Sequence, residues 1–369
     1  MSGSGPPAAK RVKRRSRLLL LLAGLALLPL LWGFLVEPGM LRNEDHEISL
    51  PEWPAACDGL RIAVLTDIHV GSPFNGLRKL DKIIEVTQQA QPDLVLLAGD
   101  YVIKGIPGGT FTPPEEIAAS LGRLSAPLGV WAVLGNHDWW LDAPRVRAAL
   151  EAAGIPVLED AAEKLSSGSC SFWLVGIGDV WEGRHDIKSA LSQVTDSSPV
   201  LAFTHNPDIF PRIPARVNLT IAGHTHGGQV WLPVLGRPIV PSLYGQRYAI
   251  GHVVEQGRHL SVSPGLGTSI IPVRFFVPPE VSVLTLRSPA GPEAMLLKRQ
   301  KQLEGEKQPW TRQALVGGRT LAAARATHAG HDPKAEQHDG ADPDPGWRHP
   351  HHVSSPGQTA DQDQVANHV

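Results

Sequence analysis

Short apolar runs alternate with segments of helical period through the middle of this 369-residue chain. The runs have the length of buried strands, and glycine, proline or polar residues bound each of them. We predict strands at Ile62–Thr66, Leu94–Ala98, Val130–Leu134, Phe172–Ile177, Val200–Thr204 and Leu219–Ala222. Strands that alternate with helices are typical of a layered α/β domain, which we place at residues 60–286.

The segments between these runs carry apolar residues three and four positions apart, as on one face of a helix. Leu80, Ile83 and Ile84 follow this spacing. We predict helices at Leu77–Ala90, Glu115–Leu124, Pro144–Ala153 and Ile187–Val194. Asp142 is expected to cap the third helix, with Pro144 in its first turn.

A nearly continuous apolar run at residues 18–36 follows a basic segment at residues 1–17. The run approaches the ~20 residues that a membrane-spanning helix needs. No small-residue cleavage pattern follows Val36, so we predict a retained, single-pass signal anchor in the cell membrane. The six cations before the run argue against a buried core helix and place the later residues on the extracytoplasmic side. A twin-arginine signal at Arg14-Arg15 is an alternative, although Arg17 departs from its pattern.

The flanking segments have a different character from the central domain. Residues 37–59 are expected to be a linker, and residues 287–369 a disordered tail, because the tail lacks a sustained apolar period. The apolar stretch Ile270–Pro279 is expected to form a core strand, with contact to the membrane as the alternative.

Charge and cysteine content exclude some functions. The net charge of −2 gives no basic field that would attract nucleic acid, so we expect no nucleic-acid partner. Cys57 and Cys170 are expected to be free thiols, although pairing across a long loop stays open.

Polar side chains able to bind a metal follow five of the six predicted strands. An Asp or His at one strand end is usually a turn former, but five in succession indicate a shared site. These residues are Asp67 and His69, Asp100, Asn136 with His137 and Asp138, His205, and His224 with His226.

The donor set consists of carboxylate, amide and imidazole groups without a thiolate. Such a set suits manganese, iron or zinc. These side chains outnumber the four ligands of one tetrahedral site, so we expect two divalent ions about 3.5–4 Å apart, a spacing that suits displacement at phosphorus.

The motifs Asp67-x-His69, Gly99-Asp100, Gly135-Asn136-His137-Asp138, His205 and Gly223-His224-x-His226 together resemble the signature of the calcineurin-like metallophosphoesterase superfamily. The resemblance implies a four-layer α/β/β/α sandwich, here preceded by one transmembrane helix, that hydrolyses phosphate esters. Glu37-Pro38, His205-Asn206-Pro207-Asp208, Gly227-Gly228-Gln229 and the segment 273–280 resemble bacterial phosphodiesterases with a membrane anchor or export signal.

The resemblance also implies roles for the site residues. Asp67, His69 and His226 would hold the first metal, Asn136, His205 and His224 the second, and Asp100 would bridge them. A water activated by the two metals would attack phosphorus. His137 would not be a ligand, and would instead stabilise charge on the phosphoryl group or protonate the leaving oxygen. Asp138 is expected to orient an imidazole.

Other residues near the motifs have two interpretations each. Asp179 either reaches the site or caps a loop. Trp139-Trp140 either pack against the domain or stack on substrate. Arg274 either binds phosphate or forms a structural ion pair. His252 and His259 lie outside the motifs and are expected to be packed or surface residues.

The residue after Gly99-Asp100 bears on the substrate. Protein phosphatases of this superfamily usually continue with a second Asp and then Arg-Gly, whereas this chain continues with Tyr101. We therefore expect a phosphodiester or pyrophosphate substrate associated with the membrane or the envelope. One alternative is a pyrophosphate hydrolase of the UDP-2,3-diacylglucosamine type in lipid A metabolism. An alternative of another class is a non-catalytic, metal-dependent binding or scaffold protein.

Overall fold

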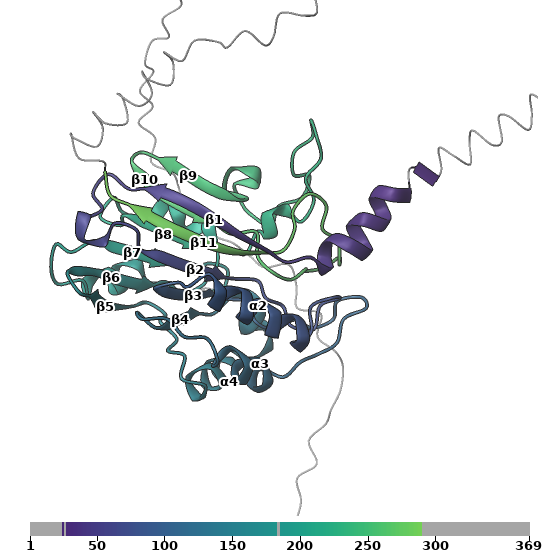
Figure 1. Cartoon of the computed structure of the whole chain (residues 1–369), viewed down its shortest axis with the longest axis horizontal. Coiled ribbons are helices and arrows are strands. Elements are labelled where there is room, and N and C mark those ends of the chain that lie inside the picture. Colours follow the sequence, from purple (N-terminus) through teal and green to yellow (C-terminus); the bar gives the residue numbers. More distant parts are fainter. Residues whose placement is uncertain (1–23, 26, 183–184, 290–369) are drawn as a thin grey trace, which may run out of the picture. The chain divides into compact units, whose positions relative to one another are not determined.

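The computed structural model of the protein describes residues 24–25, 27–182 and 185–289 (Figure 1). The expected basic segment at residues 1–17 and the expected tail beyond residue 289 lie outside these ranges.

The first sheet has five strands in the order β1-β11-β2-β3-β4. β11 runs antiparallel to β2, and the other neighbours run parallel. The strands are β1 (Arg42–Ser49), β2 (Arg61–Leu65), β3 (Leu94–Ala98), β4 (Val130–Val133) and β11 (Glu280–Arg287). β1 lies within the expected linker, so part of that linker is a strand of the domain. The residues of β1 are mostly polar, and only Ile48 among them is buried.

The second sheet has six strands in the order β5-β6-β7-β8-β10-β9. Its two edge strands run antiparallel to their neighbours, and the inner strands are parallel. The strands are β5 (Ala161–Ser167), β6 (Cys170–Gly176), β7 (Val200–Phe203), β8 (Leu219–Ala222), β9 (Gly251–Glu255) and β10 (Arg258–Val262). Each of the six predicted strands therefore exists, whereas β1, β5, β9, β10 and β11 were not predicted.

Four α-helices of the described residues flank the sheets: α2 (Leu77–Gln89), α3 (Pro114–Leu121), α4 (Asn136–Ala152) and α5 (Ile187–Ser192). α4 begins earlier than expected, at Asn136, and is interrupted at Asp142, whose φ of 177° and ψ of 87° are not helical. The carboxylate of Asp142 accepts a hydrogen bond of 3.1 Å from the backbone N–H of Arg145. The predicted cap is thus confirmed, at the start of the second half of α4.

Alternate residues of each inner strand pack on opposite faces of its sheet. In β2, Ala63 and Leu65 face the helices α2 to α4, while Ile62 and Val64 join the core between the sheets. A third cluster packs the outer face of the second sheet against α5 and the 3₁₀ turn Pro207–Arg212. The domain is an α/β sandwich built on two mixed sheets.

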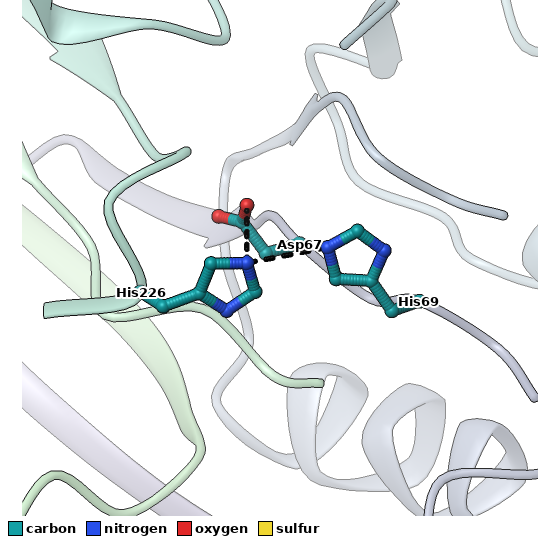
Figure 2. A group of neighbouring side chains, drawn as sticks. All are labelled: Asp67, His69 and His226. Carbon is teal, nitrogen blue, oxygen red and sulfur yellow. Dashed lines mark hydrogen bonds and ion pairs between the residues drawn. The ribbon is translucent and has the colours of Figure 1, made fainter. Parts of the chain in front are cut away.

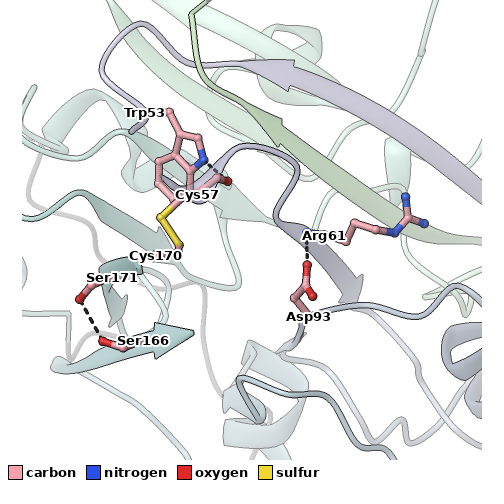
Figure 3. The surroundings of a disulfide bond; sticks show 7 residues. All are labelled: Trp53, Cys57, Arg61, Asp93, Ser166, Cys170 and Ser171. Carbon is pink, nitrogen blue, oxygen red and sulfur yellow. Dashed lines mark hydrogen bonds between the residues drawn. A yellow bond between two sulfur atoms is a disulfide. The ribbon is translucent and has the colours of Figure 1, made fainter. Parts of the chain in front are cut away.

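A disulfide joins Cys57 to Cys170, with the two Cα atoms 4.7 Å apart (Figure 3). The expectation of free thiols is therefore wrong. The bond links the turn before β2 to the start of β6, and so joins the two sheets. Trp53 packs beside it, donating its indole N–H to the Cys57 carbonyl at 2.8 Å. Sequence alone could not reveal the pairing, because the two cysteines are 113 residues apart.

The end of the apolar N-terminal run is helical. Residues 24, 25 and 27–31 form α-helix, a π-helical turn spans Trp32–Val36, and a 3₁₀ turn spans Glu37–Gly39. The part of the expected transmembrane segment before residue 24 lies outside the described residues. Within the described ranges, no helix combines the length and the hydropathy that crossing a membrane requires.

The stretch Ile270–Pro279 does not form the expected core strand. Phe275 makes one isolated parallel bridge with Val230, and the rest of the stretch is irregular. Ile270 is 78% exposed and Phe276 is 58% exposed. These two side chains therefore cannot be explained by packing in the core.

Candidate metal centre

The predicted metal ligands follow the carboxyl ends of five strands, and the two sheets bring these ends together. Asp67 and His69 follow β2, Asp100 follows β3, Asn136 follows β4, His205 follows β7, and His224 and His226 follow β8. All seven side chains belong to residues that are at most 4% exposed. A polar cluster this deeply buried needs partners that compensate for the lost water.

Five of these seven residues have a positive φ, which is uncommon for any residue except glycine. The angles are 51° at Asp67, 46° at His69, 60° at Asp100, 68° at His224 and 51° at His226. Each such conformation costs about 1–3 kcal/mol and clusters at functional sites. The surrounding domain therefore holds the backbone of this centre in a strained arrangement.

Glycines leave the space that the carboxylates occupy. A Cβ atom at Gly135 would lie 2.3 Å from Asp100 Oδ1, and one at Gly223 would lie 2.6 Å from Asp67 Oδ2. Any side chain at either position would push a carboxylate out of the centre.

The first group of side chains consists of Asp67, His69 and His226, which point toward one another in Figure 2. His226 Nε2 lies 3.3 Å from Asp67 Oδ1 and 3.2 Å from His69 Nε2. Asp67 Oδ2 accepts hydrogen bonds from the Thr66 hydroxyl and the His224 backbone N–H, both at 2.9 Å. The other carboxylate oxygen is thereby directed at the two imidazoles.

The second group consists of Asp100, His205 and His224. Asp100 Oδ2 lies 3.2 Å from His205 Nε2 and 3.5 Å from His69 Nε2, so it faces both groups. His224 Nδ1 lies 3.1 Å from His205 Nε2. A single carboxylate oxygen of Asp100 therefore lies between the two groups of potential ligands.

Three buried polar atoms of the predicted ligands have no hydrogen-bond partner among the described residues. They are Asp67 Oδ1, Asn136 Oδ1 and His224 Nε2. Leaving such atoms unsatisfied is unfavourable, and two of them belong to the groups above. Cations would satisfy them, and the donors are of the kind that manganese, iron and zinc accept. These buried His/Asp clusters are consistent with a dinuclear metal site.

The outer nitrogens of two imidazoles are fixed by backbone carbonyls. His69 Nδ1 lies 3.1 Å from the Val102 oxygen, and His205 Nδ1 lies 2.8 Å from the Ala98 oxygen. Because a carbonyl can only accept, each Nδ1 carries the proton, which leaves Nε2 free to bind a metal.

Burial dominates the electrostatics of the imidazoles. Burial, helped by charge on His137, lowers the pKa of His69 to about 3, and burial lowers the pKa of His224 and His226 well below the usual value. These three rings are therefore neutral, as a ligand must be.

The carboxylates respond differently to burial. Burial raises the pKa of Asp67 to about 6. Burial also opposes charge on Asp100 and His205, but each holds the other charged: the pKa of His205 lies well above its usual value and that of Asp100 well below. A cation between them would take the place of the His205 proton.

His137 lies beside the centre rather than within its buried core. Its ring centroid is 4.6 Å from that of His69, and its backbone N–H donates to Asp100 Oδ1 at 2.8 Å. Unlike the other imidazoles of the site, it is only partly buried. A group that exchanges protons with substrate needs such access.

Asp138 does not orient an imidazole as expected. Its carboxylate accepts hydrogen bonds from the backbone N–H groups of Asp100 at 2.8 Å, Tyr101 at 3.0 Å and Gly135 at 2.9 Å. The sequence could not distinguish an imidazole from nearby backbone as the partner. Asp138 fixes the two loops that carry Asp100 and Asn136.

Among the described residues, Arg274 pairs with backbone carbonyls rather than with a carboxylate. It is fully buried and donates to the carbonyl oxygens of Gly267 at 2.9 Å, Val277 at 3.0 Å and Pro264 at 2.9 Å. Its Nη2 lies 3.5 Å from His226 Nδ1. The guanidinium group therefore joins three loop segments behind a predicted ligand.

The structure favours the local roles for Asp179 and Trp139. Asp179 Oδ1 caps its own loop, accepting the backbone N–H groups of Trp181 at 2.7 Å and Glu182 at 3.1 Å. Trp139 packs against the core around the helices, and His252 and His259 pack on each other with ring centroids 5.1 Å apart.

Aromatic side chains border the centre, and one of them was not predicted. The Trp140 ring centroid lies 4.6 Å from that of His137, and the Trp181 centroid lies 4.3 Å from that of His224. Ser269 Oγ, also not predicted, lies 3.4 Å from His137 Nε2. Trp181 and Ser269 follow no strand end of the motif series, so the sequence pattern gave no signal for them.

Comparisons with known proteins agree with this geometry. Residues 60–228 match the family model described as calcineurin-like phosphoesterase. The uncharacterized metallophosphoesterase YkuE of Bacillus subtilis is 31% identical over 256 residues, which cover 69% of this chain and 88% of YkuE. The phosphodiesterase YaeI of Escherichia coli is 32% identical over 254 residues, covering 68% of this chain and 90% of YaeI. The UDP-2,3-diacylglucosamine pyrophosphatase LpxG of Chlamydia trachomatis is 24% identical over 311 residues, which cover 69% of this chain and 91% of LpxG.

Proposed function

The chain belongs to the calcineurin-like phosphoesterase family, and within it we propose a hydrolase of phosphodiester or pyrophosphate bonds in a membrane or cell-envelope substrate. The coarser activity is established: the chain is a metal-dependent phosphoesterase with a buried His/Asp metal site. The observation that carries the proposal is the pair of buried ligand groups with Asp100 facing both.

The residues present suit two cations. Asp67, His69 and His226 would hold one, Asn136, His205 and His224 would hold the other, and Asp100 would touch both. Two divalent ions, when bound, supply an activated water and positive charge for the phosphoryl oxygens. We favour manganese, with iron and zinc as alternatives.

The side chain of His137 completes the chemistry. It is partly exposed, it lies next to the first group, and its backbone is fixed by Asp100. In its protonated form it stabilises charge on the phosphoryl group or gives a proton to the leaving oxygen.

The environment of Tyr101 supports the diester or pyrophosphate class over phosphoproteins. Its ring is fully buried, and its hydroxyl donates to the carbonyls of Leu97 at 2.9 Å and Val133 at 2.7 Å. The position after Gly99-Asp100, which is a second Asp in protein phosphatases, is thus used for packing here. The relative YaeI is named as a phosphodiesterase, which agrees with this choice.

The disulfide supports an extracytoplasmic location for the domain. Disulfides form and persist outside the reducing cytosol. Cys57 and Cys170 are both buried and joined, as expected for a structural bond. A domain in that location would not meet a substrate that stays in the cytoplasm.

A substrate screen tests the proposal. The full chain in detergent is stripped of metal, loaded with manganese, iron or zinc, and assayed on nitrophenyl phosphate, bis(nitrophenyl) phosphate and a nucleotide-diphosphate-linked acylglucosamine. We expect the highest kcat/KM on the diester, whereas a preference for the nucleotide-linked pyrophosphate would favour the alternative substrate. A preference for the monoester would contradict the proposed class, and inactivity with every metal and substrate would favour the binding or scaffold alternative.

Topology requires a separate measurement. Alkaline phosphatase, which needs disulfides to be active, is fused after residue 289 of this chain. The chain carries His137→Ala, so that its own phosphoesterase activity does not add to the reporter signal. An active fusion is expected, whereas an inactive but abundant fusion would place the domain in the cytoplasm.

A further inference from the structure

Exposed apolar side chains from three separate segments form a surface beside the metal centre, which we call the apolar rim. The segments are the helical residues 25 and 27–36, the loop 231–244 and the loop 270–276. Representative members are Leu28 at 58% exposure, Leu31 at 49%, Trp231 at 38%, Ile270 at 78% and Phe276 at 58%. Contiguous exposed apolar surface of this kind usually marks an interaction site.

The three segments are physically continuous. The Arg274 backbone N–H donates to the Gly33 carbonyl at 2.9 Å, which joins the helix to the loop 270–276. The Trp231 and Phe276 rings are 6.1 Å apart, which joins the two loops. Between the helix and Phe275 and Phe276 lies an open apolar groove of about 470 Å³.

The apolar rim is also nearly free of charge. Residues 229–244 contain one charged residue, Arg237, and residues 265–279 contain one, Arg274. Both guanidinium groups donate to backbone carbonyls, Arg237 to that of Gly227 and Arg274 to the three named above. The loops therefore offer a water-facing surface without the charges that usually keep such loops in solvent.

The sequence of the helix indicates what covers this surface. Leu25, Leu27, Leu30, Leu35 and Val36 are each at least 45% exposed, so the helix is apolar on all sides. A helix of this kind is a core or membrane helix. It continues an apolar run that starts at residue 18, behind six cations at residues 10–17. Figure 1 shows this helix, in purple, leaving the sandwich just before β1.

The apolar rim reaches the catalytic side of the domain. Ile270 follows Ser269, whose hydroxyl lies 3.4 Å from His137 Nε2. The Gln229 amide, next to the loop 231–244, holds the same turn by accepting the Ser269 N–H at 2.8 Å. The loop 270–276 of the apolar rim thus begins directly after a residue that lies beside His137.

We propose that the apolar rim is seated in the acyl region of a lipid bilayer, so that the metal centre meets phosphate groups at the bilayer surface. Interfacial segments of this kind bury their apolar side chains about 5–10 Å deep at the boundary of headgroups and acyl chains. The substrate class that follows is a phosphate diester or diphosphate carried by a membrane lipid. Only this last statement rests on the proposed function.

The depth of the apolar rim can be measured without turnover. Single cysteines are introduced by Ile270→Cys and Phe276→Cys, and labelled with an environment-sensitive maleimide dye; Cys57 and Cys170 are already paired. Val254→Cys is the matched control, because Val254 is 53% exposed and pairs with His259 at the opposite end of β10 from the centre. The labelled full chains are incorporated into vesicles of phosphatidylcholine and phosphatidylglycerol with brominated acyl chains.

We expect flotation with the vesicles, strong quenching of the dye at positions 270 and 276, and no quenching at position 254. No flotation, or equal fluorescence at all three positions, would overturn the proposal. A third outcome is that the bromine does not quench the dye, while protection of the dye from iodide increases with protein concentration. This outcome would also overturn the proposal, and it would assign the surface to contact between two copies of the chain.

A second comparison separates this proposal from the proposed function. The variant Ile270→Ser/Phe276→Ser and the control Val254→Ser are assayed on soluble bis(nitrophenyl) phosphate and on phosphatidylglycerol in vesicles. We expect unchanged turnover of the soluble ester and a loss confined to the vesicle substrate in the double variant. If the wild type cleaves neither diester, the phosphodiester part of the proposed function fails, while the quenching result still decides where the apolar rim lies.

Discussion

Glu37 Oε2 accepts a hydrogen bond of 2.9 Å from the backbone N–H of Phe276, a residue 239 positions further along the chain. The same carboxylate accepts the Val277 N–H and the Trp32 indole N–H, each at 2.5 Å. Glu37 is only 2% exposed, so a buried charge joins the end of the N-terminal helix to the loop that carries Arg274. The helix end is thus an integral part of the domain.

The variant Glu37→Gln is expected to destabilise the fold by about 1.5–3 kcal/mol, because hydrogen bonds to a charged group are of this strength. The amide can replace one acceptor but not both. Urea unfolding of the full chain in detergent measures the change. Glu163→Gln, at an exposed position of β5, is the control and is expected to change stability by less than about 0.5 kcal/mol. Equal stability of the two variants would contradict the role given to Glu37.

Removal of the disulfide is expected to lower the unfolding free energy by about 4–5 kcal/mol in the chain-entropy account of a loop this long. The loop spans 113 residues and links the two sheets. The test compares unfolding midpoints of the wild type, with and without reductant, and of Cys57→Ala/Cys170→Ala. Reduced wild type should behave like the double variant, and an unaltered midpoint would show that the bond contributes little.

Replacement of His137 by Ala is expected to reduce turnover by about 10²–10⁴-fold, as for the loss of a general acid or base. Metal binding should persist, because the two buried ligand groups remain. Steady-state kinetics with manganese on the best substrate measure the loss, and His252→Ala is the control histidine. Wild-type rates in His137→Ala would remove this residue from the mechanism.

Manganese is expected to stabilise the folded protein, because a ligand that binds only the native state adds about 2.7 kcal/mol at a concentration of 100 Kd. Asp67→Asn should lose this response, since Asp67 Oδ1 is one of the buried atoms without a partner. His252→Gln, outside the centre, should keep it. Thermal unfolding with manganese and with EDTA gives the comparison, and an identical midpoint in both would argue against a resident metal.

A pH-dependent contribution to stability is expected from His46, whose Nε2 lies 2.7 Å from Glu280 Oε1 between β1 and β11. The hydrogen bond to Glu280 raises the pKa of His46 against a smaller effect of burial, with help from the charges of Glu44 and Asp45. A raised pKa means that the stabilisation is fully present below about pH 6.5, the unfolded value, and is lost as the pH rises through the folded pKa.

The measurement is the difference in unfolding free energy between wild type and His46→Gln as a function of pH, which should shrink as the pH rises. His252 is a control of opposite sign. Burial and the neighbouring His259 lower the pKa of His252, so its contribution should be lost as the pH falls. If the pH profiles of His46→Gln and His252→Gln were parallel, both pKa directions would be contradicted.

The sequence predicts the inner strands and the convergence of the ligands because both depend on local pattern. A buried strand such as Leu94–Ala98 is a continuous apolar run, and Asp100 follows it directly. The sequence does not predict β1, because an edge strand with one buried residue reads as a polar linker.

Features that depend on contacts between distant residues were also missed. The pairing of Cys57 with Cys170 and the approach of Ser269 to His137 are set by how the two sheets pack, which no local pattern reports. Asp138 was assigned a partner of the wrong kind for a related reason: its spacing from Gly135 is visible, but the return of the Asp100 loop is not.

The position of β11 in the first sheet has a consequence for biosynthesis. This strand, formed by residues 280–287, lies between β1 and β2, which precede it by more than two hundred residues. Until it emerges, β1 and β2 each present an unpaired edge, and such edges promote association between nascent chains. A chain truncated before residue 280 should therefore aggregate, and a polypeptide threaded through a membrane unfolded would complete this sheet only after nearly all of the domain has crossed.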